Sequence, residues 1–108
     1  MRKQNIEHTR LLVLGLLSNG DMYGYQMIVE LERRSDGTFA MREGTLYPVL
    51  HGMEKDGLVD AYEQAAPTGR MRKYYRLTRK GKEALKTEAQ DWKRYAAAVD
   101  AVLGVSLA

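Results

Sequence analysis

REGTLYPVLHGMEKDGL, residues 42–58, is the stretch that decides the fold, because it combines a complete apolar helix face with an unusual outer face. Apolar side chains follow the i, i+3, i+4, i+7 spacing of a helix that lies on a core. They are Leu46, Val49, Leu50 and Met53. The spacing therefore predicts a short helix that is buried on one side.

The outer face of this predicted helix has a composition suited to contact with a large partner. Its members are Gly44, Thr45, Tyr47, Pro48, His51, Gly52 and Lys55. Glycines remove side-chain bulk, and hydroxyl, imidazole and ammonium groups are of the kinds that bind base edges and phosphates. Taken alone, the same residues are equally consistent with a poorly optimised, solvated face. The rest of the chain has to distinguish between these two interpretations.

Pro48 restricts where the helix can start. Proline has no N–H, so it fits a helix without loss only in the first turn. We therefore predict Thr45 as the N-cap, with Pro48 in the first turn, since an earlier start would kink the helix. Gly57 predicts the end of the helix, because glycine is a common helix stop.

Two further helices are expected before this stretch. Residues 6–17 are nearly all apolar after Arg10, which predicts a central core helix. A second helix should run from about Gly24 to Arg34, with one apolar face. A helix, a compact loop and another helix with a contact face form the helix-turn-helix pattern of DNA-binding proteins.

Tyr23 and Tyr25 stand at the predicted start of the second helix. Their phenols lie beside backbone N–H groups at a helix N-terminus, an arrangement that can hold a phosphate. Each ring taken singly fits a position that caps the core, or a partly exposed position, at least as well.

A two-stranded hairpin is predicted after the contact helix. Residues 58–63 and 73–77 are rich in β-branched, aromatic and alternating residues, and they flank an open tip. Positive charge concentrates at the tip and on the return strand, at Arg70, Arg72, Lys73 and Arg76. A basic hairpin directly after a helix-turn-helix forms a winged helix, whose wing reaches the sugar-phosphate backbone.

From Thr78, a good N-cap, the sequence takes on the period of a long helix. A continuous apolar seam follows, made of Leu85, Ala89, Trp92, Tyr95, Ala96, Val99, Val102 and Leu103. Its own domain can cover the first turns of this helix, but the seam is too broad for one small winged domain to cover fully. Packing against a second copy is the most economical burial, and a symmetric pair would present two contact helices to a two-fold DNA site.

The composition is that of one globular domain. The chain has 108 residues, with 44% hydrophobic and 29% charged residues. Its net charge of +3 and pI near 9.2 permit a polyanionic partner without requiring one. It has no cysteine, no apolar run long enough to span a membrane, and an N-terminus unlike a signal peptide. We therefore expect a cytoplasmic protein without disulfides or a membrane partner.

Enzyme chemistry has little support in the sequence. The chain has two histidines, no glycine-rich phosphate loop and no Gly-x-Ser-x-Gly turn. Its carboxylates are scattered among basic residues and fit surface ion pairs. We therefore expect no catalytic residues, no cofactor and no metal site.

Four sequence blocks follow one another along the chain. They are YGY at residues 23–25, GTLYP at 44–48, EKDGL at 54–58 and RKYYRLT at 72–78. In these blocks the chain resembles the PadR family of bacterial transcriptional regulators, over roughly residues 8 to 103. The single C-terminal helix is similar to that of the family's small subfamily.

Members of this subfamily are mostly dimeric repressors, and some of them release DNA when they bind phenolic acids or planar drugs. The resemblance therefore implies a dimeric repressor. Trp92 stands where a multidrug-responsive member carries a tryptophan that stacks on drugs between the subunits. Packing within a dimer explains a tryptophan at this position at least as well.

The sequence thus predicts a mainly α protein with a two-stranded wing. Residues 1–78 form the winged helix-turn-helix domain and residues 79–108 the C-terminal dimerisation helix, together one compact unit. The expected function is a ligand-responsive homodimeric repressor that binds double-stranded DNA at a two-fold operator. The alternative is a ligand-binding or protein-docking winged helix without specific DNA recognition.

The predicted DNA contacts are Tyr23, Tyr25, Thr45, Tyr47, His51, Lys55, Arg70, Arg72 and Lys73. All lie on the contact helix, at the start of the helix before it, or on the hairpin. Trp92 is the expected site of a planar aromatic effector.

Overall fold

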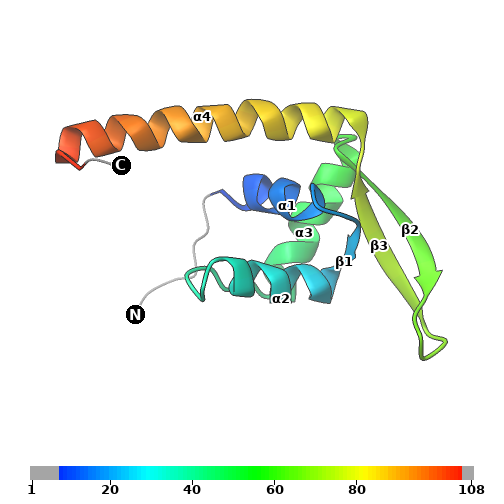
Figure 1. Cartoon of the computed structure of the whole chain (residues 1–108). Coiled ribbons are helices and arrows are strands. Elements are labelled where there is room, and N and C mark those ends of the chain that lie inside the picture. The colour runs from blue at the N-terminus through cyan, green and yellow to red at the C-terminus, as the bar shows by residue number, and fades with distance from the viewer. Residues whose placement is uncertain (1–7, 106–108) are drawn as a thin grey trace.

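The computed structural model describes residues 8–105, which form a bundle of three helices, a projecting β-hairpin and a long fourth helix (Figure 1). In chain order the elements are α1 (Thr9–Leu17), β1 (Met22–Tyr23), α2 (Gly24–Arg34), α3 (Glu43–Lys55), β2 (Val59–Ala65), β3 (Met71–Leu77) and α4 (Arg79–Leu103). Helix α4 packs against α1 and continues beyond the bundle. The mainly α winged fold expected from the sequence is confirmed.

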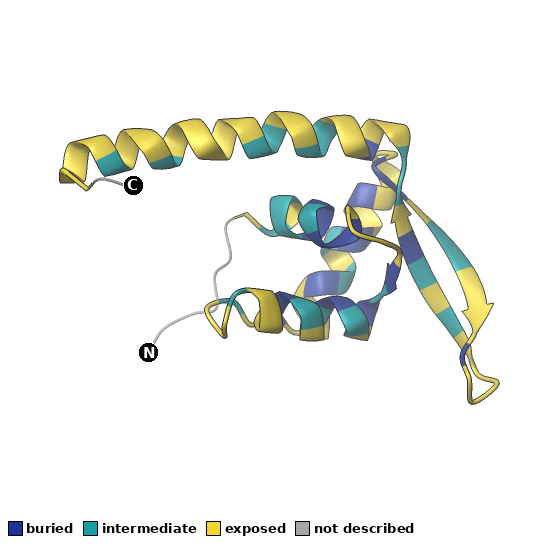
Figure 2. Cartoon of the chain, in the orientation of Figure 1, coloured by how far each residue is buried: buried dark blue, intermediate teal, exposed yellow. Residues whose placement is uncertain are grey.

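The core lies where α1, α2 and α3 meet and where the sheet covers them (Figure 2). The predicted stripe of α3 is buried as expected, since Leu46, Leu50 and Met53 are each at most 1% exposed. Val49, at the edge of that stripe, is half-buried, and Leu14 at the centre of α1 is fully buried. Burial of one such side chain stabilises the fold by roughly 1.5–3 kcal/mol, so these contacts hold α3 in place.

The predicted start of α3 was wrong. The helix begins at Glu43 and not after Thr45, so Pro48 lies in its second turn. Arg42 takes the extended N-cap conformation, and its carbonyl accepts hydrogen bonds from the N–H groups of Thr45 and Leu46. The helix therefore starts three residues earlier than predicted, with Arg42 and not Thr45 as the N-cap, and it continues through a proline that has no N–H to donate.

Helices α1 and α2 precede the contact helix, and their observed bounds can be compared with the predicted ones. Helix α2 has the predicted bounds, Gly24 to Arg34. Helix α1 begins at Thr9 within the described residues, and its predicted start at Ile6 lies outside them.

The sheet has three strands and not the two that the sequence predicted. Its order is β1-β3-β2, with both neighbouring pairs antiparallel. Strand β1 is only two residues long, and it places Met22 opposite Tyr75 and Tyr23 opposite Tyr74. Two residues are too few to show alternation, so this strand left no periodic signal in the sequence.

The start of α4 is fixed on the turn that ends α3. Thr78 caps α4 as predicted, because its Oγ1 accepts the Gly81 N–H at 3.0 Å. The same hydroxyl donates to the Gly57 carbonyl at 2.6 Å, and the Thr78 N–H donates to the Leu58 carbonyl at 3.0 Å. Gly81 is buried so closely on Leu58 that a Cβ there would overlap the Leu58 carbonyl oxygen. Only glycine allows this approach.

We predict that Gly81→Ala lowers the free energy of unfolding by roughly 1–3 kcal/mol, because the added methyl group has to displace a backbone carbonyl. Chemical denaturation at a fixed protein concentration measures the change.

Gly52→Ala is the matched control for Gly81→Ala. Gly52 is exposed on α3 with no neighbouring atom near its Cβ position, so alanine should leave stability unchanged or raise it. A Gly81→Ala variant as stable as the parent would show that α4 is not fixed by this contact.

Candidate nucleic-acid interface

Helix α3 presents one continuous exposed face opposite its buried stripe. The exposed residues are Gly44, Thr45, Pro48, His51, Gly52 and Lys55. Outside the helix itself, no heavy atom lies within 4 Å of a Cβ built on Gly44 or on Gly52. The backbone of α3 can therefore be approached closely, as entry of a helix into the major groove requires.

Tyr47 differs from the other predicted contacts on α3. It is half-buried, and its hydroxyl lies against Gly24 at the first position of α2. Burial raises the pKa of the Tyr47 phenol, and the nearby Glu43 carboxylate raises it further. The phenol is therefore packed between two helices and is not a freely exposed group.

The two tyrosines at the start of α2 have different surroundings. Tyr25 is 59% exposed, so its phenol is available to a partner. Tyr23 is half-buried at the N-cap position, where its N–H is 3.4 Å from the Gln26 side-chain oxygen. Its ring also meets the Tyr74 ring edge-on at 5.4 Å, so Tyr23 is part of the sheet surface.

The outer face of the sheet carries an array of rings and guanidinium groups. The Tyr74 ring stacks on the Tyr62 ring at 5.7 Å, while Arg72 lies 4.4 Å over the Tyr23 ring and Arg76 lies 5.3 Å over the Tyr62 ring. Each such cation–π contact contributes roughly 0.5–1 kcal/mol at an exposed site. Sequence reasoning missed this array, although the alternation of tyrosine and arginine along β3 was a usable signal.

The remaining basic groups of the wing are free of such stacking on the outer face. Arg70 and Lys73 are exposed, and Lys73 points to the other face, where its Nζ lies 5.6 Å from the centre of the Tyr75 ring. The tip is an ordered turn, since the Ala66 N–H donates to the Arg70 carbonyl at 2.7 Å. The wing thus carries one exposed cation at its tip and another on its return strand.

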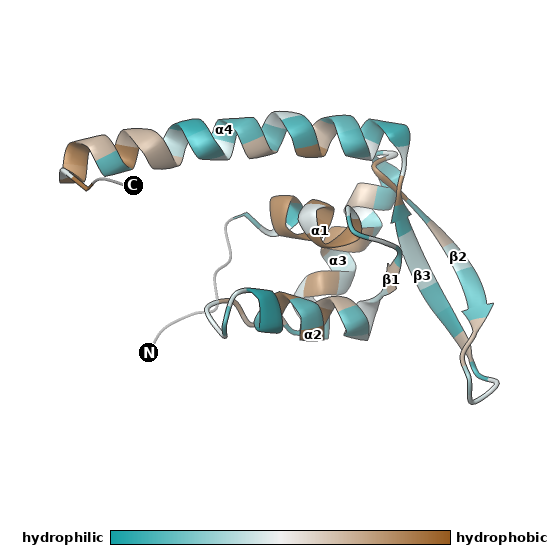
Figure 3. Cartoon of the chain, in the orientation of Figure 1, coloured by the Kyte–Doolittle hydropathy of each residue, from teal (hydrophilic) through white to brown (hydrophobic). Residues whose placement is uncertain are grey.

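The predicted seam of α4 is covered only in its first turns. Leu85 and Ala89 are half-buried against the chain's own domain, whereas Trp92 is 43%, Tyr95 61% and Val102 86% exposed. The rest of the seam is Ala96, which is half-buried, and Val99 and Leu103, which are exposed. The distal end of α4 therefore carries apolar side chains that nothing in the described chain covers (Figure 3).

An apolar groove of about 500 Å³ lies between α1, the end of α2 and α4. Its lining includes Leu11, Leu12, Gly15, Leu31, Phe39, Leu85 and Trp92. No atom lies within 4 Å of a Cβ built on Gly15, so this glycine leaves the groove open. The groove is the natural continuation of the uncovered face of α4.

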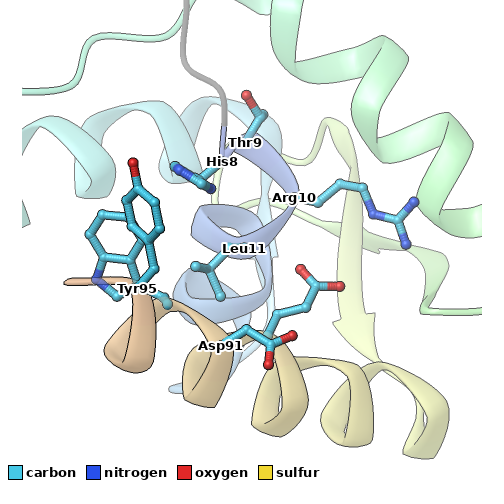
Figure 4. A pocket seen from close by; sticks show the side chains of 8 residues that line it. His8, Thr9, Arg10, Leu11, Asp91 and Tyr95 are labelled. Carbon is cyan, nitrogen blue, oxygen red and sulfur yellow. The ribbon is translucent and has the colours of Figure 1, made fainter. Parts of the chain in front are cut away.

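A second pocket, of about 630 Å³, lies beside Trp92 between the start of α1 and α4 (Figure 4). It is lined by His8, Thr9, Arg10, Leu11, Glu88, Asp91, Trp92 and Tyr95. The Trp92 ring meets His8 edge-on at 5.0 Å and Tyr95 at 5.8 Å. Trp92 therefore lines both the groove and the pocket and presents its aromatic ring to each of them.

Residues 8–105 contain neither a membrane-spanning helix nor a cluster of metal ligands. No helix in this range is long and apolar enough to cross a membrane. In the same part of the chain, no three histidine, cysteine or carboxylate side chains gather in a way that could hold a metal ion.

The helical bundle, the exposed face of α3 and the basic wing beside it define a winged helix-turn-helix protein. The chain belongs to the transcriptional regulator PadR-like family, which its sequence matches over residues 13–87. Proteins of this family are DNA-binding regulators of transcription and not enzymes, and the resemblance seen in the sequence is thereby confirmed.

Several relatives show the same likeness along most of their length. The transcriptional regulator Rv3488 of Mycobacterium tuberculosis is 36% identical over 85 residues, covering 79% of this chain and 76% of the relative. A PadR family transcription regulator of Clostridium difficile is 31% identical with a TM-score of 0.77, covering 89% of this chain and 98% of that chain. A PadR-like regulator of Bacillus cereus is 29% identical with a TM-score of 0.80, covering 92% and 94%.

Proposed function

We propose that this chain is a cytoplasmic, homodimeric repressor that binds a two-fold DNA operator and releases it in response to a planar aromatic compound. The DNA-binding part rests on the open face of α3 together with a wing that carries the exposed cations Arg70 and Lys73. Such a surface matches a groove flanked by phosphates.

Base edges and phosphates are assigned to different residues of this surface. Thr45, His51 and Lys55 project from the exposed face of α3 and would meet base edges in the major groove. Arg70 and Lys73 would neutralise phosphates beside it. Tyr23, Tyr25 and Arg72 are proposed as further backbone contacts, from the start of α2 and the outer face of the wing.

The uncovered apolar face of α4 supports the dimer. Val99, Val102 and Leu103 remain exposed in the single chain, while the groove beside α1 offers an apolar surface. A second copy would bury both the distal side chains of α4 and the groove beside α1, because both surfaces are apolar. A two-fold arrangement would then place two α3 helices for one operator.

The effector site is proposed at Trp92. Its ring lines both the groove and the neighbouring pocket, so a flat aromatic compound can stack on it. The compound would change operator affinity only if it bound one spacing of the two subunits better than another.

A mobility-shift assay with the DNA upstream of the chain's own gene tests the function. A complex that survives excess scrambled competitor is expected. Equal binding to every duplex, or none, would favour the alternative, a winged-helix module that docks a protein or a small ligand without specific DNA recognition.

We predict that α3 determines the preference for the operator sequence and that the wing contributes affinity for any DNA. Thr45→Ala should relax the preference for the operator by roughly 1–3 kcal/mol, because a base contact is lost. Arg70→Ala and Lys73→Ala should weaken the operator and scrambled DNA equally, and each should reduce the salt slope by about one unit. Fluorescence anisotropy over a salt series measures both effects.

Arg94→Ala is the control for the wing variants, because Arg94 is an exposed cation on α4 that pairs with Asp91. Its salt slope should equal that of the parent. An unchanged slope in both wing variants would show that the wing does not touch the backbone.

We predict that Val99→Asp shifts the protein toward monomer and weakens binding to a two-fold operator, because the new carboxylate would be buried without a partner. Analytical ultracentrifugation measures the association. Ala101→Asp places the same charge on the opposite side of α4 and should leave the dimer intact. A monomeric parent protein would refute the proposed dimer.

Trp92 provides a built-in probe of the effector site, since it is the only tryptophan. We predict that a planar aromatic compound quenches its fluorescence and changes operator affinity over the same concentration range. Trp92→Leu should still bind the operator but no longer respond. If a series of such compounds gives neither effect, Trp92 serves only in packing.

A further inference from the structure

The Tyr47 ring packs directly on the backbone of α2. Gly24 is buried, and a Cβ on it would overlap the Tyr47 hydroxyl and lie 2.7 Å from Cζ of the ring. The ring itself is half-buried and packs against the core, so a side chain at position 24 would have to displace a packed aromatic ring. Tyr47 and Gly24 thus allow a close approach of the two helices.

Tyr47 also packs against the core cluster that includes Tyr75 of the wing strand β3. Its phenol is within electrostatic range of Tyr75 and Lys73 on β3, as well as of Glu43 on its own helix. Tyr75 is fully buried, and Lys73 lies over its ring. One side chain of α3 is thus placed where α2, α3 and β3 meet.

The position of Tyr47 along α3 makes this contact important for recognition. It lies in the second turn, between the exposed residues Thr45 and His51. A shift of α3 on this ring would move both of them, and contacts that read base edges tolerate displacements of only about 0.5 Å.

We propose that Tyr47 is a positioning residue, which sets the orientation of α3 on α2 and β3, and that its hydroxyl does not read a base. The proposal rests on the proposed DNA-binding function and assigns the source of its specificity. It also explains how a buried residue, Gly24, would influence the choice of DNA without touching it.

Tyr47→Phe separates the two roles, because it removes the hydroxyl and keeps the ring. If Tyr47 positions α3, the ratio of operator affinity to scrambled-DNA affinity should stay within about twofold of the parent value. Gly24→Ala should lower the same ratio by about tenfold or more, since the methyl group pushes the ring and α3 away. Both ratios are measured well below the melting temperature, with circular dichroism to show that the variants are folded.

A double-mutant cycle tests the contact itself. In a Tyr47→Ala background the phenol is gone, so Gly24→Ala should have little further effect on the affinity ratio. Val29→Ala, an exposed change on the same helix, is the control and should leave the ratio unchanged. If Gly24→Ala does not fold, the Tyr47→Phe result alone decides.

The inference is overturned if Tyr47→Phe loses discrimination as severely as Tyr47→Ala, because the hydroxyl would then contact DNA. It is also overturned if folded Gly24→Ala keeps the parent ratio. A parent protein that does not discriminate between operator and scrambled DNA would instead refute the proposed function, so the two failures are distinguishable.

Discussion

The close contact between Gly81 and the Leu58 carbonyl is the constraint on which the arrangement of the molecule depends. It lies where α3 ends, the wing begins and α4 starts. Donors from Thr78 and the start of α4 bind carbonyls of the turn that follows α3, among them Lys80 Nζ, 2.9 Å from the Asp56 carbonyl. The Asp56 carboxylate pairs with Arg10 of α1 at 3.4 Å. The end of α3 and the start of α4 are thus connected through one turn.

The contact between Gly81 and Leu58 also bears on the uncovered distal half of α4. Helix α4 leaves the bundle and exposes valine, leucine and tryptophan side chains. The position of its distal half therefore depends on the surface that covers these side chains. The near end of α4 is fixed on the turn that follows α3. In the proposed dimer, a change in how the distal halves of α4 pack would therefore alter the placement of the two α3 helices. Coupling of this kind needs no movement inside the DNA-binding bundle, which fits the dense core of α1, α2 and α3.

The sequence predicted the parts of the fold that rest on periodicity. The bounds of α2, the buried stripe of α3 and the cap of α4 at Thr78 followed from local patterns. Strand β1 and the burial of Tyr47 did not, since each depends on residues distant in sequence. The start of α3 was missed because Arg42, which offers no side-chain cap, takes the N-cap position. The Tyr47 ring is placed by Gly24, and β1 exists only because Met22 meets Tyr75. Alternation along β3 showed which side chains share a face, but not that Arg72 stacks on Tyr23.

We infer that α3 and the wing tip form the surface that meets specific DNA. Amide chemical shifts of the isotope-labelled protein, followed by NMR during titration with its operator duplex, test this inference. We expect the largest changes for Gly44, Thr45, His51, Gly52 and Arg70, with scrambled DNA changing Arg70 far more than α3. Changes confined to the distal half of α4, or identical changes with both duplexes, would contradict it.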